Sequence, residues 1–460
     1  MKTNAKFGSK LAVALCAAAM LPMAAEAADV YYRWKTAGDG NWNDKANWEY
    51  SSSSSGPWAD LSEDIAVPNG NTSIVTFPVQ NLVYTITFQE DVQVKQLTIE
   101  NDPNPNTNRY KHRPIFDLKG HKFTDSYFTN DNVLQIYGFV SGSDDGLAMD
   151  YGPVCTFRNG RLVVARQSGR LMLGASSANR GGAYVFDNAT FTGRFQVLRG
   201  KNKIYIENGS IVTNTTEFIV CNQESNTQTY NTMFPRLCVR GVDSMFYCAY
   251  SAKFTNEGAG LYAMDGGYVN VSNLVVGAAH TGAGMGIYNA TNCFAFATNG
   301  TIKVWGDLEV GSDYEKCGGT YLKIMGKNGV IMQTETYGKL KIYENTGAHI
   351  DIAIPENGFA DDADVVRAPL QANDIEFIAR DAGKTQGDTF KLNVAGAADW
   401  LNAHSKEKLV LVEIATSNPT VLERIKNAVV SDVDSSKFAV SSDGRKLLLV
   451  KSSGLVIIFK

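Results

Sequence analysis

The amino-acid sequence predicts an all-β protein, a right-handed parallel β-helix (a solenoid of stacked coils) with a small C-terminal β-rich capping module containing one helix. Three observations support this fold class: a degenerate Asn-Gly repeat, short alternating apolar segments, and 42 glycines with few long helical patterns. With 460 residues and 44% hydrophobic content, the chain can build a sizeable core. A β-sandwich array with similar strand lengths remains an alternative.

Each copy of the repeat places Asn-Gly before an apolar residue and, about ten positions later, an apolar triplet that ends in glycine. Full copies begin at Asn159 and Asn299, and partial copies begin at Asn208 and Gly266. Asn and Gly tolerate positive φ, so the pair predicts a tight corner, while the triplet predicts a half-buried strand. The interval from Asn159 to Asn208 is 49 positions, but that from Asn299 to Asn328 is only 29. This irregularity indicates a loose β-helix with corner loops of variable length.

Residues 1–27 are predicted to be a secretory signal peptide. They combine lysines at positions 2, 6 and 10, an Ala-rich apolar stretch over 11–25, and a small-x-small cleavage site at Ala27. The apolar stretch is too short for a membrane span, which needs about 20 residues. We therefore expect an exported mature chain without a transmembrane segment, located outside the cell or at its surface.

The charge of the chain excludes some partners. Cleavage removes three Lys and one Glu, which takes the formal net charge from −4 to −6. No basic stripe with interleaved aromatic residues is visible, which argues against nucleic acid and against an anionic membrane as partners. We expect surface glycans or other cell-surface proteins as partners, and no cofactor.

Residues 28–75 are predicted to form a Trp-rich N-terminal cap. They hold four of the six tryptophans, at positions 34, 42, 48 and 58. As a cap, the bulky rings would close the open end of the solenoid, and we expect Trp42 in particular to be buried. The alternative is a carbohydrate-binding face made by Trp34, Trp48 and Trp58, because exposed aromatic rings stack on the faces of sugars.

The same segment carries a family resemblance. The motif GDGNWNDKANW at 38–48, followed by Val-Pro-Asn-Gly at 67–70 and an alternating strand at 84–88, resembles the start of secreted bacterial β-helix proteins related to autotransporter passengers. The resemblance implies loose strand repeats over 76–355, a short capping module over 356–460, and an adhesin-like surface role. A translocator β-barrel would need many more amphipathic strands than the C-terminal residues provide, so we expect a passenger-like protein without its barrel.

No catalytic residues are predicted. In the enzymatic relatives of this group, pectin lyases and polygalacturonases, aspartates and a basic residue cluster on one face of adjacent coils, and no such Asp pairing occurs in the repeat strands here. The acids near repeat corners are Asp187, Glu207 and Asp265, and exposed acids at corners ordinarily serve solubility. An enzyme would be indicated if carboxylates from different coils converged with Lys or Arg.

No metal site is predicted either. His112 and His121 flank one strand without a third ligand, and the acids at 144–145 and at 361, 362 and 364 lie in Gly- or Ala-bearing turns where Asp is expected anyway. The mature chain has an even number of cysteines in an oxidising compartment, so both disulfides and free buried thiols are open, with free thiols favoured. Cys238 and Cys248 are the closest pair in sequence. The six cysteines are Cys155, Cys221, Cys238, Cys248, Cys293 and Cys317.

In the C-terminal module, strands are expected at 370–379, 409–414, 438–440, 447–450 and 455–459 around a helix at 419–429 that begins with Asn-Pro. An Asp-Gly turn at 443–444 predicts a hairpin. The sequence as a whole predicts a secreted or cell-surface structural, adhesin-like β-helix protein with no evident catalytic site. The alternatives are a polysaccharide-active enzyme (lyase or hydrolase) or a glycan-binding protein on the same scaffold.

Overall fold

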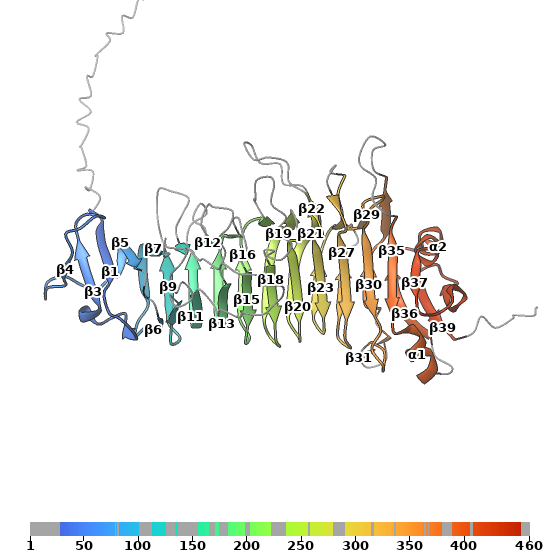
Figure 1. Cartoon of the computed structure of the whole chain (residues 1–460), viewed down its shortest axis with the longest axis horizontal. Helices are drawn as coiled ribbons and strands as arrows, with labels where there is room; N and C mark the ends of the chain where they lie inside the picture. The colour runs from blue at the N-terminus through green and yellow to red at the C-terminus, as the bar shows by residue number, and fades with distance from the viewer. Residues whose placement is uncertain are drawn as a thin grey trace, which may run out of the picture.

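The computed structural model of the chain describes residues 28–78, 80, 82–100, 113–125, 134–136, 155–164, 171–173, 183–197, 203–221, 236–255, 258–278, 290–313, 317–334, 337–359, 361–362, 365–366, 368–379, 389–404 and 408–451. The predicted signal peptide and the predicted closing strand at 455–459 lie outside these residues. The described part is an elongated stack of short, mostly parallel strands with helices at its C-terminal end (Figure 1). It is a β-helix solenoid, and this confirms the predicted fold class.

Each coil contributes strands to three faces, which we call faces I, II and III, and strands in one face pair in parallel with those of the coils before and after. Face I contains β2 (Gly40–Asn41), β6 (Val83–Thr87), β8 (Arg113–Asp117), the first halves of β11 (Cys155–Val164) and β13 (Ala183–Gly193), β15 (Lys203–Glu207), β18 (Arg236–Arg240), β20 (Gly260–Met264), β23 (Phe294–Thr298), β27 (Tyr321–Met325), β30 (His349–Ala353), β35 (Lys391–Ala395) and β37 (Val429–Ser431).

Faces II and III continue each coil. Face II contains the first half of β7 (Val92–Ile99), β9 (Lys122–Asp125), the second halves of β11 and β13, β16 (Ile211–Asn214), the first halves of β19 (Met245–Thr255) and β21 (Tyr268–Ala278), β24 (Thr301–Val304), β28 (Val330–Gln333), β33 (Leu370–Ala372) and β36 (Lys408–Ile414). Face III contains β1 (Val30–Trp34), β5 (Gly70–Phe77), the second half of β7, β10 (Leu134–Ile136), β12 (Leu171–Leu173), β14 (Phe195–Val197), β17 (Phe218–Cys221), the second halves of β19 and β21, β25 (Leu308–Val310), β29 (Leu340–Tyr343) and β34 (Ile375–Ile378).

The predicted Asn-Gly corner is the turn from face I to face II. Its first residue has φ between +50° and +63° in successive coils, a conformation that Asn and Asp tolerate best among non-glycine residues. Neighbouring corner side chains bond along the stack, as where Asn188 Nδ2 donates to Asn159 Oδ1 at 3.0 Å. Gly160 has no room for a Cβ because Leu118 of the preceding coil lies against it. The corner residues are Asn159, Asn188, Asn208, Asp243, Asp265 and Asn299.

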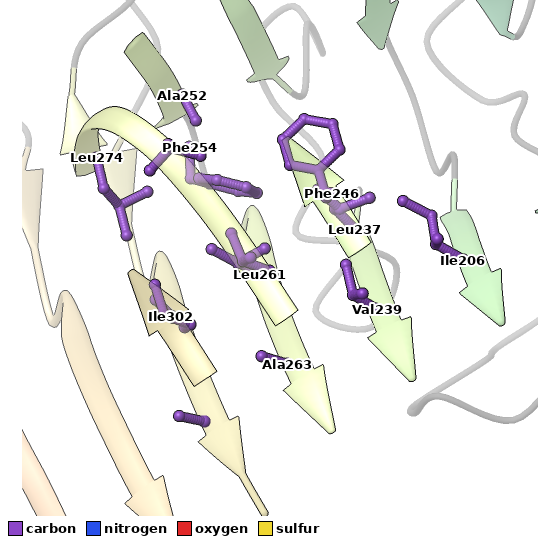
Figure 2. Packing of buried hydrophobic residues seen from close by; sticks show 14 of the residues in the cluster. Ile206, Leu237, Val239, Phe246, Ala252, Phe254, Leu261, Ala263, Leu274 and Ile302 are labelled. Atoms are coloured by element: carbon purple, nitrogen blue, oxygen red, sulfur yellow. The ribbon is translucent and has the colours of Figure 1, made fainter. Parts of the chain in front are cut away.

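The core lies inside the three faces and follows from the alternation of side chains along each strand. On face I, Leu237, Val239 and Leu261 point inward toward side chains of the other two faces, Phe246 among them (Figure 2). All of these side chains are fully buried. Because each coil adds the same layer, one continuous hydrophobic cluster extends from the N-terminal tryptophans to the last hairpin.

The two ends differ from the middle. At the N-terminus, β3 (Trp48–Ser51) and β4 (Ala59–Asp60) continue face III in antiparallel fashion from β1. At the C-terminus, β38 (Phe438–Val440) and β39 (Lys446–Val450) form the predicted hairpin, and β39 pairs antiparallel with β36. Two minor two-stranded sheets project from the stack: β22 (Ala290–Thr291) with β26 (Cys317–Gly318), and β31 (Asp361–Asp362) with β32 (Val365–Val366).

The C-terminal region departs from the sequence prediction in three ways. Parallel pairing continues past residue 355 through β34, β35 and β36, so further solenoid strands lie beyond the predicted boundary. The strand expected at 370–379 is two strands, β33 and β34, separated by a corner. One helix was expected, but the described residues of this region contain two: α2 (Pro419–Asn427), whose Asn418 cap accepts the Val421 N–H at 3.2 Å, and α1 (Ala397–Ala403), which no sequence signal had indicated.

Strand β8 contains a proline, Pro114, which lies opposite Tyr84 of β6. Proline is accommodated there because the next coil pairs with β8 only from Ile115 onward. Among the described residues, no helix has the length and apolar character required to cross a membrane.

Candidate ligand-binding face

The predicted carbohydrate-binding tryptophans are part of the core. Trp34 and Trp48 have 0% exposure, as does Trp42, whose burial was predicted. Trp42 and Trp48 meet edge to face with centroids 4.8 Å apart, and the Trp48 Nε1–H donates to the Trp42 carbonyl at 2.8 Å. A sugar cannot stack on a ring that solvent does not reach, so the carbohydrate-binding prediction was wrong for Trp34 and Trp48.

For Trp58, the carbohydrate-binding role stays a prediction. Its side chain is half-buried, and the guanidinium of Arg33 lies 4.6 Å from the ring centroid. Arg33 also pairs with Glu49 through Nη2 and Oε2 at 2.5 Å, so the cation is anchored on both sides. One face of the Trp58 ring is therefore already occupied by a cation–π contact.

A second aromatic cluster lies on the outer side of face I, and the sequence prediction missed it. Strands β15, β20, β23 and β27 each carry aromatic residues between the inward-pointing ones, whereas β18 between them carries Arg236 and Cys238. The rings of β20, β23 and β27 contact one another from coil to coil. We call this cluster the aromatic face; it consists of Tyr205, Tyr262, Phe294, Phe296 and Tyr321.

A sequence signal for the aromatic face did exist. Strands β15 (KIYIE) and β20 (GLYAM) have no interior polar position, so both of their sides must be covered. Strand β23 (FAFAT) has the same character. A half-buried strand would alternate apolar with polar residues, and these strands do not.

The strand register and the missing side chain at Gly260 explain how the rings fit together. Gly260 is the register neighbour of Phe294 on the preceding coil, and a Cβ at Gly260 would collide with the Phe294 ring. The ring fills the place of the missing side chain and meets Tyr262 edge to face, with centroids 5.1 Å apart. Phe294 and Phe296 lie 4.5 Å apart, and Tyr321 is 5.4 Å from Phe296. The result is a contiguous aromatic surface across three coils.

The solvent exposure of the rings increases along the aromatic face from β15 to β27. Tyr205, Tyr262 and Phe294 are buried, whereas Phe296 and Tyr321 are half-buried and open to solvent. Beyond Tyr321, the ring of His349 stacks on the Tyr321 ring at 4.8 Å with the planes 6° apart. The row therefore runs from a covered part near β15 to a more open part near β30.

Cations accompany the aromatic face. Arg236 and Lys203 are register neighbours on adjacent coils, and each has only 8% exposure. The Arg236 guanidinium lies 5.8 Å from the ring centroids of both Tyr262 and Phe294. Farther along, Lys323 Nζ lies 5.5 Å from the Phe296 ring centroid. Burial raises the pKa of Tyr262 to about 12, although the Arg236 charge acts in the opposite direction, so this phenol is neutral at pH 7.

Arg236 is unusual in its environment. The Nε atom is buried and has no hydrogen-bond partner among the residues that the structure describes. No carboxylate within that part of the chain forms an ion pair with its guanidinium. A buried, incompletely bonded cation is costly, because desolvation is not offset by a partner.

Two of the three corner acids do come together. Asp187 and Glu207 are register partners at the end of face I, and Arg240 Nη2 lies 2.7 Å from Glu207 Oε1. Burial raises the pKa of Glu207, the Arg240 charge lowers it, and the Asp187 charge raises it further. Asn208 Nδ2 donates to Asp187 Oδ1 at 2.6 Å. Asp265 is itself a corner residue with positive φ.

The remaining metal and thiol candidates form no centre in the described residues. His121 Nδ1 lies 3.7 Å from Asp91 Oδ1, and no cluster of three potential ligands is present in that part of the chain. His112 and the acids at 144, 145 and 364 lie outside the described residues, as do the side chains of Asp361 and Asp362.

The cysteines that the structure describes are buried, namely Cys155, Cys238, Cys248 and Cys293, and the first three of them are free thiols. The suggested Cys238–Cys248 bridge is absent because Cys238 points outward from face I, whereas Cys248 points into the core. Burial raises the pKa of Cys238 to about 12, so this thiol is inert at neutral pH. The side chains of Cys221 and Cys317 lie outside the described part.

Fold and site together define a class: a parallel β-helix solenoid with an aromatic, cation-bearing outer face. Comparison with protein-family models, with curated proteins and with solved structures finds no match to this chain. The functional conclusion therefore depends on the geometry of the molecule itself.

Proposed function

We propose that this chain is an exported surface protein whose β-helix is a rigid adhesive scaffold, and that the aromatic face is its ligand-binding surface. The observation that carries the proposal is the outward-facing aromatic cluster on consecutive coils of face I. Outward positions of a strand that faces solvent are usually polar, and apolar side chains that stay partly exposed side by side mark interaction sites. The buried rings Tyr205, Tyr262 and Phe294 contribute to stability, whereas the half-buried Phe296 and Tyr321 leave aromatic surface open to a ligand.

The proposed ligands are surface glycans. Sugar rings have apolar faces that pack on aromatic side chains and hydroxyl groups that need hydrogen-bond partners. Polar groups stand next to the open part of the aromatic face: Asp351 follows Lys323 in register, and Asn393 Nδ2 donates to Asp351 Oδ1 at 2.7 Å. The combination of half-buried rings with fixed polar groups suits a carbohydrate better than a purely apolar partner.

A binding experiment tests the proposal. The mature chain and the double variant Phe296→Ser/Tyr321→Ser are applied to an array of immobilised polysaccharides. We expect the double variant to lose retention while its melting temperature changes by only a few degrees, because both rings are partly exposed. The matched control is Tyr337→Ser, an 86%-exposed aromatic residue outside face I, which should bind like the parent. Unchanged retention by the double variant would refute the proposal.

One observation favours the enzymatic alternative as a second candidate. Asp187 and Glu207 are register partners on adjacent coils, and Arg240 lies 2.7 Å from Glu207, so two carboxylates from different coils stand beside a basic residue. Glu207, with its raised pKa, would be the acid. Assays for new reducing ends and for unsaturated products, on the parent and on Glu207→Gln, decide this: product formation by the parent but not by the variant would establish an enzyme.

A further inference from the structure

We propose that the ligand of face I is an acidic polysaccharide, and that the guanidinium of Arg236 receives one of its anionic groups while sugar rings lie on the neighbouring aromatic side chains. This inference rests on the proposed function and adds the chemical class of the glycan. Carboxylate and sulfate groups each present at least two acceptor oxygens. The planar guanidinium of Arg binds such a pair of oxygens through two parallel hydrogen bonds.

The first argument is the unsatisfied guanidinium. Only 8% of the Arg236 surface is exposed, and its Nε has no hydrogen-bond partner in the described part of the chain. The Tyr262 and Phe294 rings, with centroids 5.8 Å from the guanidinium, stabilise the cation through their faces but cannot accept an in-plane N–H bond in the way an anion does. An anion bound here would offset a desolvation cost that the free protein carries.

The second argument is charge complementarity. Lys203 precedes Arg236 in register, and Lys323 stands beside the open end of the aromatic face. Cations thus gather on this face of a chain whose formal net charge is −4. Two acids of face I, Asp187 and Glu207, lie at the other end of their strands, where Arg240 lies against Glu207 and Asn208 bonds Asp187. A third, Asp351, is the register neighbour of Lys323 and accepts a hydrogen bond from Asn393, on strands farther along the stack than Arg236. A local positive surface on a net acidic protein selects acidic ligands at this position.

The third argument is the position of the rings relative to the cation. The Phe294 ring lies across Gly260 between Arg236 and the half-buried Phe296. A polymer that rests on Phe296 and Tyr321 would therefore extend toward Arg236 along the same face. Contact with the guanidinium requires rotation of the Phe294 side chain, and side-chain rearrangements of this kind are common on binding.

The test uses the mature chain, residues 28–460, with alginate as the acidic probe and carboxyl-reduced alginate as its neutral counterpart. Dextran sulfate, dextran, polyglutamate and single-stranded DNA complete the set. We expect alginate and dextran sulfate to bind, the neutral polymers to bind much more weakly, and the affinity to fall as salt is added. Tighter binding of polyglutamate or DNA than of either acidic polysaccharide would overturn the inference.

Variants assign the contact to Arg236. We expect Arg236→Met to weaken alginate binding by about 10- to 100-fold, the effect of losing charge-assisted hydrogen bonds. Arg236→Lys should recover only part of the loss, because an ammonium lacks the planar fork. Arg161→Met removes an exposed arginine from face II and should bind alginate like the parent.

A stability measurement separates a binding role from a structural one. If Arg236 serves the ligand, Arg236→Met keeps or raises the melting temperature of the free protein, because an incompletely bonded buried cation has been replaced by an apolar side chain of similar length. A loss of several degrees together with unchanged alginate affinity would assign Arg236 to folding and overturn the inference. Equal binding of alginate and its neutral form, abolished by Phe296→Ser/Tyr321→Ser but not by Arg236→Met, would overturn only this inference and leave the proposed function intact.

Discussion

The protein contains two aromatic clusters that stand on opposite sides of their strands. In the N-terminal cap, Trp34, Trp42, Trp48, Phe77 and Phe88 point into the solenoid and are at most 1% exposed. On face I, phenylalanine and tyrosine rings point outward and lie next to cations. The difference teaches that the number of aromatic residues does not indicate a candidate binding surface; the side of the strand on which they stand does.

The polar atoms of the two clusters differ in charge. In the cap, the Trp42 Nε1–H donates to the Pro68 carbonyl at 2.9 Å, and that of Trp48 donates to the Trp42 carbonyl. The Trp34 Nε1–H and, on face I, Arg236 Nε are both buried without a hydrogen bond from any described residue. An unpaired neutral N–H in a core costs less than an incompletely bonded buried cation, so the charge of Arg236 and its place on the outer side of the strand distinguish it from Trp34.

The largest expected effect is in the cap. Trp48→Ala should lower the free energy of unfolding by about 3–5 kcal/mol, because it leaves a cavity between Trp34, Trp42 and Phe77. Denaturant unfolding followed by circular dichroism measures it. The control is Trp58→Ala, which removes a half-buried ring and should cost about 1 kcal/mol or less. Equal losses for both variants would contradict the assignment of Trp48 to the core of the cap.

The second-largest effect is expected at Gly260, beneath the aromatic face. Gly260→Ala should destabilise by about 1–3 kcal/mol, because its Cβ would collide with the Phe294 ring. In the double variant Gly260→Ala/Phe294→Ala the collision disappears, so the two effects should be strongly non-additive in a double-mutant cycle. Additive losses would mean that the Phe294 ring does not lie over Gly260 in solution.

A third prediction concerns Asp117, a buried carboxylate that lies between the two clusters. Burial would raise its pKa, but hydrogen bonds from Asn159, Lys119 and Arg158 and the charge of Arg158 outweigh burial and lower it. Asp117→Asn should therefore cost about 1–2 kcal/mol at pH 7. Since the folded pKa lies below the unfolded value of about 3.9, the contribution is complete above that value and is lost as the pH falls through the folded pKa.

The measurement for Asp117 is urea unfolding of the parent and of Asp117→Asn between pH 7 and pH 2. The difference in unfolding free energy should be constant down to about pH 4 and then shrink toward zero. Asp434→Asn is a suitable control, because that carboxylate is exposed and bonds only within its own turn. A difference that is unchanged at pH 2 would show that the lost charge is not the cause.

The smallest expected effect is at Glu207. Burial raises its pKa in the folded state, so the folded protein holds the proton more tightly than the unfolded chain. Stability should then decline as the pH rises from the unfolded value of about 4.3 through the raised folded pKa. Melting temperatures between pH 4 and pH 8 should show this slope in the parent and a flatter profile in Glu207→Gln. The same slope in both proteins would assign the pH dependence to another group.

Much of the fold could be predicted because its rules are local. The positive φ of Asn159, Asn208 and Asn299 follows from the steric tolerance of Asn, and the cap of α2 follows from Asn418 and Pro419. The buried position of Trp42 follows from the need to close the end of a stack. These features depend on residues within a few positions of one another, so the sequence displays them directly.

Which residues lie side by side on face I was decided only by the tertiary structure. Arg236, Gly260, Phe294 and Tyr321 become neighbours through strand register, and the intervals between them are unequal because the corner loops differ in length. The same holds for Asp187 and Glu207, which looked like isolated corner acids. The sequence by itself determined the corners, the strands and the solenoid, because local sterics and alternation govern them. Only the stacking of coils decided which residues make up the aromatic face, because parallel pairing joins residues across loops whose lengths encode no register.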